Sequence, residues 1–204
     1  MNLAELLEDT SVSLREDSCN HRDTAILFSS YANSKGGTVL FGIRKNGKIK
    51  GVHPQNIIED INYALDTFCD SPIVWRYDKL IEGRHLLLEV HVSEDEKKVS
   101  IKNSIQKEYY SWIGNTFVQV NKIILKVWSL ESGRSELKEL DMVEKDIVQL
   151  IKNKDKISLS LLYKNVKGKN SIVESGLAQL IYKNSIFVIC DNDELKYSLV
   201  DIID

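Results

Sequence analysis

Apolar positions recur at two different spacings along the chain, and their pattern changes near residue 132. Before that point, apolar residues at helical spacing predict helices over residues 22–33 and 54–68. A short helix is expected over residues 3–7, and residues 11–18 are expected to be extended or irregular. Runs of β-branched and aromatic residues predict strands over residues 38–44, 48–52, 73–80, 84–92, 107–113 and 116–128. The pattern therefore predicts an α+β domain, a mixed sheet with helices, over residues 1–132.

The last third of the chain is richer in helical pattern. Apolar residues predict helices over residues 141–152 and 158–163 and a third helix from Ser171, with Asp141 and Ser171 as N-caps. Two strands follow, over residues 186–190 and 195–199. Three helices followed by a hairpin is the order of a winged helix-turn-helix domain, which we expect over residues 137–204. The polar segment of residues 132–135 is the expected boundary between the two domains.

Small and turn-forming residues mark the ends of the predicted elements in the first domain. Asn33, Gly36 and Gly37 end the first long helix, because glycine tolerates the left-handed backbone conformation there. Asn46-Gly47 predicts a type I′ hairpin turn, since both central residues of that turn need a positive φ. Tight packing and close approach of a phosphate both explain the glycines, and the sequence leaves the two readings open. The remaining glycines with an expected turn role are Gly42 and Gly51.

Composition limits the classes of function. The chain has 27 Lys and Arg against 30 Asp and Glu, so its net charge is −3 and nucleic-acid binding would have to come from a local patch. No run of 18 apolar residues is present and the first residues do not resemble a signal peptide, so we expect a cytoplasmic protein without a membrane span. The three cysteines are far apart and the histidines are scattered, which predicts reduced thiols and no metal site.

One basic strip surrounds the predicted hairpin. No Asp or Glu occurs between Arg44 and Ile58, so this surface is locally positive. Such a strip can hold phosphates through charge and backbone N–H groups, and a solvated hairpin is the alternative. The expected nucleic-acid-binding residues here are Lys35, Arg44, Lys45, Lys48 and Lys50.

A second basic group precedes the last predicted helix. Residues 136–204 contain ten Lys against twelve Asp and Glu, yet residues 152–169 contain six Lys and only one acid. Lys164, Lys167, Lys169 and Asn170 lie just before the third helix, where a helix-turn-helix protein meets phosphates. On the expected outward face of that helix, only Gln179 is suited to reading a base. Dimerisation or docking of a partner is the alternative role of this domain.

Two segments resemble a known protein family. Residues 30–43 read SYANSKGGTVLFGI, and residues 46–52 read NGKIKGV. These segments resemble the Schlafen AlbA-type domain family, and the resemblance covers most of residues 5–130. The shared pattern is a helix ending in Ala-Asn, a Gly-Gly turn, a strand ending in Gly and a hairpin returning to Gly-Val. The resemblance implies a DNA-binding or transcriptional-regulator protein, because bacterial members with a C-terminal winged helix are described in this way. Some eukaryotic relatives cleave RNA through acidic residues that bind a metal.

The chain departs from the family at the acidic positions of the RNA-cleaving relatives. Glu8 can occupy the first position, but the second, Glu-Phe-Lys in the family, reads Ser13-Leu14-Arg15 here. The third acid lies beyond the hairpin, where residues 50–53 read Lys-Gly-Val-His. Metal-assisted cleavage of a phosphodiester needs clustered carboxylates, so we expect no nuclease activity. Glu16 or Asp17 could substitute for the second acid.

Two further departures bear on function. Trp112 replaces the arginine of a Tyr-x-Arg-x-Gly signature that the family carries late in the domain. The segment from Gly42 to Ile49 is close to a P-loop, but Ile49 stands where Ser or Thr would hold Mg²⁺, and a P-loop joins a strand to a helix. We therefore predict neither ATP nor another cofactor.

These observations favour a non-catalytic nucleic-acid-binding protein, with DNA preferred over RNA as the partner and a homodimer compatible with the pattern. The first alternative is a metal-dependent nuclease with a rearranged acidic site. The second is an interaction module whose basic strips bind an acidic protein. The sequence indicates no small-molecule substrate.

Overall fold

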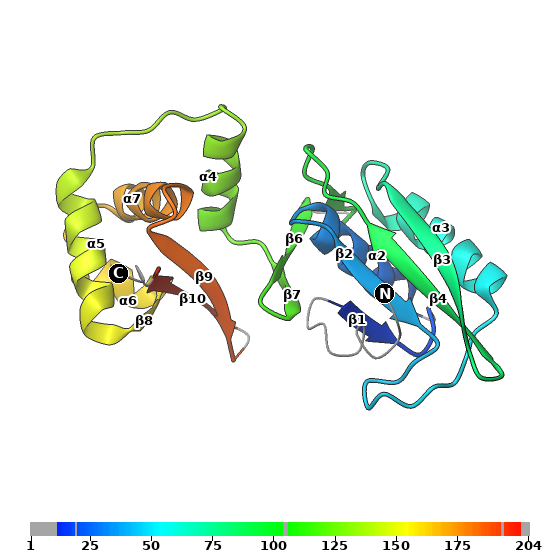
Figure 1. Ribbon diagram of the computed structural model, residues 1–204. Helices are drawn as coiled ribbons and strands as arrows, with labels where there is room; N and C mark the ends of the chain where they lie inside the picture. The colour runs from blue at the N-terminus through cyan, green and yellow to red at the C-terminus, as the bar shows by residue number, and fades with distance from the viewer. Residues whose placement is uncertain (1–11, 19, 104–105, 193, 201–204) are drawn as a thin grey trace. The chain divides into compact units, whose positions relative to one another are not determined.

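The chain forms two compact units, Met1–Gln119 and Val120–Asp204 (Figure 1). The computed structural model describes residues 12–18, 20–103, 106–192 and 194–200. The helix expected over residues 3–7 lies outside these described residues. Within them, no helix combines the length and the apolar character needed to cross a membrane.

A four-stranded sheet of order β1-β2-β4-β3 is the centre of the first unit. β1 (Val12–Arg15) pairs in parallel with β2 (Gly37–Phe41), and β4 (His85–Val92) pairs antiparallel with both β2 and β3 (Trp75–Glu82). The parallel pair needs a crossover, which α2 (His21–Ala32) supplies. α2 and α3 (Pro54–Phe68) pack on one face of this sheet, where their apolar residues form the main core.

A smaller three-stranded sheet of order β5-β6-β7 completes the first unit. It contains β5 (Ser100–Ile101), β6 (Glu108–Ile113) and β7 (Thr116–Gln119). The carboxylate of Asp70 holds β5, because the Ser100 backbone N–H and hydroxyl donate to it at 2.9 and 2.6 Å and Lys107 at 2.9 Å. Burial alone would raise the pKa of Asp70, but these hydrogen bonds outweigh it and lower the pKa to about 2.

Asn33 joins α2 to the smaller sheet. Its side-chain amide donates to the carbonyls of Val99 and Tyr110, both at 2.8 Å, and its Oδ1 accepts the Val99 N–H at 2.7 Å. The next residue, Ser34, accepts the Trp112 backbone N–H at 2.9 Å. The Ala-Asn end of the helix therefore has a structural role, because it fixes β6 beside α2.

The segment after β2 differs from the predicted hairpin. Gly47 has a φ of 80°, but Asn46 is not among the residues of positive φ, so the turn is not of type I′. The Gly47 N–H donates to the Arg44 carbonyl at 2.8 Å, and only an isolated bridge joins Ile43 to Ile49. Residues 48–52 therefore form no regular strand. Their backbone turns back toward Gly42, whose carbonyl accepts the N–H groups of residues 50 and 51.

The second unit contains four helices and a three-stranded antiparallel sheet of order β8-β10-β9, within the described residues. α5, α6 and α7 and the β9–β10 hairpin occur in the predicted order, whereas the sequence pattern does not predict β8. The elements of this unit are α4 (Lys122–Glu131), α5 (Asp141–Lys154), β8 (Lys156–Ser158), α6 (Leu159–Asn165), α7 (Asn170–Tyr182), β9 (Ile186–Asp191) and β10 (Glu194–Leu199).

The prediction of a strand over residues 116–128 is wrong after Gln119. Residues 122–131 form α4, because the Asn121 side chain caps the helix by accepting the backbone N–H groups of Ile123 and Ile124 at 2.9 and 3.2 Å. Ile123 and Val127 lie one turn apart and enter the core of the second unit. The division between the units therefore falls at Gln119, and the expected boundary at residues 132–135 lies inside the second unit.

The predicted N-caps of the second unit also differ from the structure. Leu140 and Lys169 occupy the N-cap positions of α5 and α7, and neither makes a side-chain capping hydrogen bond. Asp141 lies in the first turn of α5, where its negative charge is favourable to the helix dipole.

Candidate nucleic-acid interface

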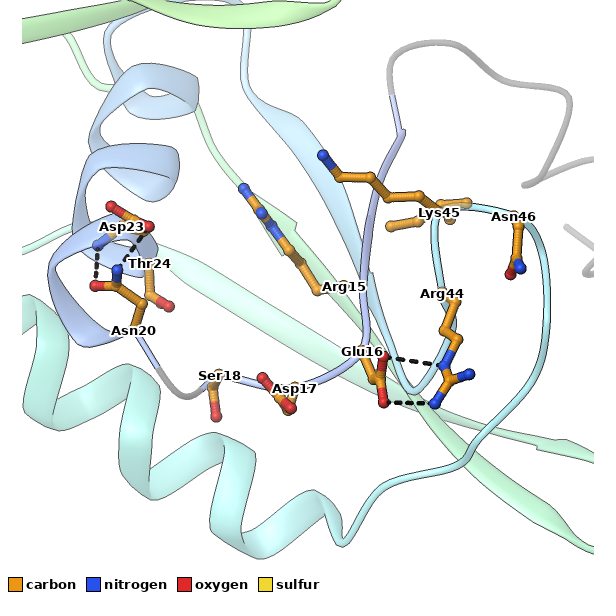
Figure 2. A pocket seen from close by; sticks show the side chains of 11 residues that line it. Arg15, Glu16, Asp17, Ser18, Asn20, Asp23, Thr24, Arg44, Lys45 and Asn46 are labelled. Atoms are coloured by element: carbon orange, nitrogen blue, oxygen red, sulfur yellow. Dashed lines mark hydrogen bonds and ion pairs between the residues drawn. The ribbon is translucent and has the colours of Figure 1, made fainter.

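Two adjoining cavities share Leu14, Arg15 and Lys45 in their linings, and both lie within the first unit. One has a volume of about 490 Å³ and contains residues of both charge signs; we call it the mixed-charge cavity (Figure 2). It is lined by Leu14, Arg15, Glu16, Asp17, Ser18, Asn20, Asp23, Thr24, Arg44, Lys45 and Asn46.

The other, which we call the basic cavity, has a volume of about 400 Å³. Arg15 and Lys45 are the only ionisable residues among its described lining. The described residues that line it are Val12, Ser13, Leu14, Arg15, Lys45, Trp112, Asn115, Thr116 and Phe117. The described lining of this cavity is therefore positive, in contrast to that of its neighbour.

Glu16 pairs with two cations at the base of the turn. Its carboxylate accepts hydrogen bonds from Arg44 Nε and Nη2 at 3.0 and 3.3 Å, and Lys50 Nζ lies 2.7 Å from it. The hydrogen bonds from Lys50 and Arg44 hold the pKa of the Glu16 carboxyl below its usual range. Two of the expected phosphate-binding residues, Arg44 and Lys50, are therefore already paired with an acid.

Among the described cations that line the two cavities, Arg15 and Lys45 lack such a partner. Both line both cavities, and neither side chain makes a hydrogen bond or ion pair with another described residue. Figure 2 shows both side chains extended, Arg15 from the end of β1 and Lys45 from the turn. In the sequence, Arg15 stands out only as part of a departure from a family motif. Its place beside Lys45 depends on the parallel pairing of β1 with β2, which the sequence pattern does not predict.

The remaining lysines of the expected strip do not form one cluster. Lys48 is exposed on the turn. Lys35 precedes β2, whereas Arg44 and Lys45 follow it, and the five residues of that strand separate the two ends by roughly 13 Å. The structure therefore places Lys35 away from the two cavities.

The described carboxylates around these cavities are not grouped as metal ligands. Ser13, at the position of the family's second acid, lies in β1 opposite Val39 and brings no carboxylate. Glu16 is held by Arg44 and Lys50, two cations that compete with any metal for its oxygens. Within the described residues, no three His, Cys, Asp or Glu side chains are grouped as metal ligands. Glu8 lies outside the described residues.

Packing explains the glycines of the turn region. A Cβ at Gly37 would overlap the Tyr31 ring, and one at Gly42, whose φ is 97°, would lie 2.7 Å from a methyl group of Leu87. Gly36 and Gly51 also have positive φ values and close backbone or side-chain neighbours. These contacts favour the packing reading over approach of a phosphate.

In the second unit, Lys164, Lys167, Lys169 and Asn170 are all exposed at the end of α6 and the start of α7. None of the three lysines makes an ion pair with a described residue. This part of the expected interface is open to an anion.

The expected base-reading face of α7 is not open. Between Val173 and Leu180 every residue except Ser175 is buried, and α4 packs along this side of α7. Gln179 is 1% exposed, and its side chain pairs with the Lys138 backbone at 2.6 and 3.0 Å. The expectation that Gln179 reads a base is therefore wrong. The physical reason is that α4 and the segment after it cover this side of α7, and the sequence pattern does not predict α4.

An ion pair between Lys122 of α4 and Glu174 of α7 joins the two helices. The buried carboxylate of Glu174 lies 2.7 Å from Lys122 Nζ and accepts the Tyr163 hydroxyl at 2.8 Å. Burial opposes ionisation, but hydrogen bonds from Lys122 and Tyr163 hold the pKa of Glu174 below its usual range. A truncated partner would leave a buried charge, so this contact is costly to break.

The first unit is a mixed α+β domain with an Ala-Asn helix end, a Gly-Gly turn and a basic cavity. The family model described as Schlafen, AlbA_2 matches residues 8–121. The chain therefore belongs to the Schlafen AlbA_2 family. The match ends close to Gln119, where the first unit ends. Membership is consistent with a function related to nucleic acid.

Solved structures give weaker likenesses. The DIP2311 protein from Corynebacterium diphtheriae is similar at 15% identity and a TM-score of 0.46, over 59% of this chain and 24% of that chain. This chain thus spans about a quarter of that protein's length. The N-terminal domain of a RecG-related protein from Nitrosomonas europaea, named for an ATP-dependent DNA helicase, is similar at 19% identity and a TM-score of 0.41, over 52% of this chain and 84% of that domain. No curated protein matches the chain.

Proposed function

We propose that the protein binds nucleic acid through its phosphates, without strong sequence preference, and does not cleave it. The observation that carries the proposal is the basic cavity, where Arg15 and Lys45 stand without a described acidic partner in a protein of net charge −3. Elsewhere in the same region, Arg44 and Lys50 are paired with Glu16. An unpaired positive cavity in an acidic protein attracts anions locally, and a nucleic-acid backbone is an extended anion.

Arginine and lysine contribute differently to such a site. The planar guanidinium of Arg15 can donate two hydrogen bonds to one phosphate, whereas Lys45 acts as a mobile point charge. Contacts of this kind position the nucleic acid and carry no base information. They therefore support binding of either DNA or RNA, and the preference for DNA stays a prediction.

The absence of cleavage rests on the acids. Hydrolysis through a metal needs several carboxylates free to hold the cation. Ser13 brings none, and Glu16 is engaged by Arg44 and Lys50. We therefore propose that the site binds but does not hydrolyse its ligand.

We assign the second unit to the winged-helix class, on the order of its helices α5, α6 and α7, strand β8 and hairpin β9–β10. In this assignment Lys164, Lys167 and Lys169 contact phosphates, while α7 reads no bases because its middle is buried. A role in transcription would then come from a partner or from structure in the nucleic acid. The burial of α7 also supports a second candidate for this unit, a module that docks a partner protein.

A gel-shift panel tests the proposal. Single- and double-stranded DNA and RNA of random sequence are titrated with the full chain at two salt concentrations, with Mg²⁺ or Mn²⁺ present in parallel samples. Binding that weakens at higher salt, with all strands intact on a denaturing gel, is the expected result. Strands that are shortened only when metal is present would contradict the non-catalytic role. The absence of any shift at low salt would contradict binding.

A further inference from the structure

We infer that the basic cavity takes an unpaired nucleotide of a single-stranded nucleic acid, with its base against Trp112 and Phe117 and its phosphate at Arg15 and Lys45. The inference rests on the proposed function and adds the strandedness of the ligand to it. It depends on the two aromatic residues, which phosphate binding alone does not require.

Trp112 and Phe117 form a directly opposed pair across the β6–β7 hairpin. Both are partly buried, both pack against the main core, and both line the same cavity as the two cations. Opposed residues of an antiparallel pair have Cβ atoms about 5 Å apart, so the two rings lie on the same face of the hairpin. The cavity thus has an aromatic wall and a cationic wall.

The aromatic wall is held in place. The Trp112 ring packs on the Tyr31 ring of α2, with centroids 4.6 Å apart and planes inclined by 39°. Its backbone N–H donates to Ser34 Oγ at 2.9 Å, which ties β6 to the end of α2. A ring that is already fixed loses little conformational freedom when a base stacks on it.

This combination of groups matches the chemistry of single-strand binding. Positive side chains follow the backbone, and aromatic rings stack on bases of any sequence. In a duplex both faces of each base are stacked on neighbouring pairs, so the base cannot reach an aromatic wall without being flipped out at a cost of a few kcal/mol. A cavity of about 400 Å³ also lies within the usual size of small-ligand pockets, about 300–1,000 Å³.

The test compares three ligands of equal phosphate number: a twelve-nucleotide oligo(dT), an abasic strand of the same length, and a duplex. An oligo(U) arm separates RNA from DNA. Affinities are measured by fluorescence anisotropy at one salt concentration for the full chain. The variants are Trp112→Leu, Phe117→Leu and the double variant Arg15→Ala with Lys45→Ala, and the control is Tyr77→Leu, an exposed aromatic residue outside the cavity.

We expect oligo(dT) to bind more tightly than both the abasic strand and the duplex. Either cavity-wall variant should weaken oligo(dT) by at least about fivefold, the effect of losing one base stack, and leave the abasic strand unchanged. Tyr77→Leu should bind like the wild type. Circular dichroism checks the fold of each variant. If Trp112→Leu does not fold, the affinity of Phe117→Leu for oligo(dT) tests the stacking of the base.

Two results would overturn the inference in distinguishable ways. If the abasic strand or the duplex binds as tightly as oligo(dT), and Phe117→Leu changes nothing, the base does not stack in the cavity. Provided that the double cation variant still weakens all ligands, the proposed function survives that result. If the double cation variant changes no affinity, the proposed function fails at this site and the inference fails with it.

Discussion

Gln179→Ala should destabilise the second unit without changing its affinity for nucleic acid. Gln179 is 1% exposed, and its side chain makes three hydrogen bonds: one accepted from the Lys138 N–H, one donated to the Lys138 carbonyl and one donated to the Glu144 carboxylate. Together the first two tie the segment before α5 to α7. A glutamine that reads bases would instead be exposed and free.

The magnitude follows from these hydrogen bonds. Three of them at about 0.5–1.5 kcal/mol each give a decrease in stability of about 1.5–4.5 kcal/mol. Because Lys138 is exposed, water can replace part of the hydrogen bonding that its backbone loses in the variant. We therefore expect a decrease in stability near the lower end of this range, about 2 kcal/mol. Ser171→Ala, at an exposed position near the start of the same helix, is the control and should change the stability by less than about 0.5 kcal/mol.

The assay is urea unfolding followed by circular dichroism, with hydrogen exchange of the α7 amides to assign the change to the second unit. Affinity for random duplex DNA is measured on the same variants. An unchanged unfolding midpoint for Gln179→Ala, together with weaker DNA binding, would refute the conclusion that α4 and its connection cover the reading face of α7.

Three further predictions concern other parts of the chain. Replacing Lys164, Lys167 and Lys169 by Ala should weaken binding to every duplex sequence alike. The slope of log affinity against log salt should become shallower by at most about 2.7, or about 0.9 for each phosphate that a lysine neutralises. An effect confined to one sequence would contradict this prediction. Asp70→Asn should lower the free energy of unfolding near pH 7 by about 2 kcal/mol, because a carboxyl whose pKa is about 2 in the folded protein stabilises the fold above pH 4. In an acid titration of both proteins, the difference in stability should vanish as the pH falls through 2. Labelled RNA and DNA should stay intact with Mg²⁺ or Mn²⁺, and cleavage that Glu8→Ala abolishes would show that an acidic site exists.

The elements with regular hydrophobic spacing are predictable from the sequence. Residues 54–68 form the predicted helix α3, and the strands at residues 186–190 and 195–199 are present. The helix α4 is not predicted because Ile123, Ile124, Val127 and Trp128 are β-branched or aromatic, and such residues are typical of strands. Asn121 is the signal that points to a helix instead, since asparagine is a favoured N-cap.

The unpredicted helix α4 explains why the expected base-reading face of α7 is buried. Without α4, one side of α7 has no partner, so polar residues such as Glu174 and Gln179 look exposed. In the structure Glu174 pairs with Lys122 of α4, and Gln179 pairs with the segment that follows α4. Side-chain exposure depends on which element covers a face, and local spacing does not determine that.

In the first unit the sequence predicts a basic surface but not its distribution. Lys45 is among the expected residues, whereas Arg15 is not, because the two come together only through the pairing of β1 with β2. The opposite error concerns Arg44 and Lys50. Glu16 lies 28 residues before Arg44 and pairs with both, a long-range contact that charge spacing along the chain does not show.

The salt dependence of single-strand binding by the double variant Arg15→Ala, Lys45→Ala tests the central claim most directly. If both cations contact phosphates, the variant should bind oligo(dT) more weakly than the wild type, and the slope of log affinity against log salt should be shallower by up to about 1.4, or 0.7 for each single-strand phosphate. The variant Lys35→Ala, at the other end of β2, should keep the wild-type slope. Equal affinities and slopes for the double variant and the wild type would contradict the assignment of the basic cavity as the nucleic-acid site.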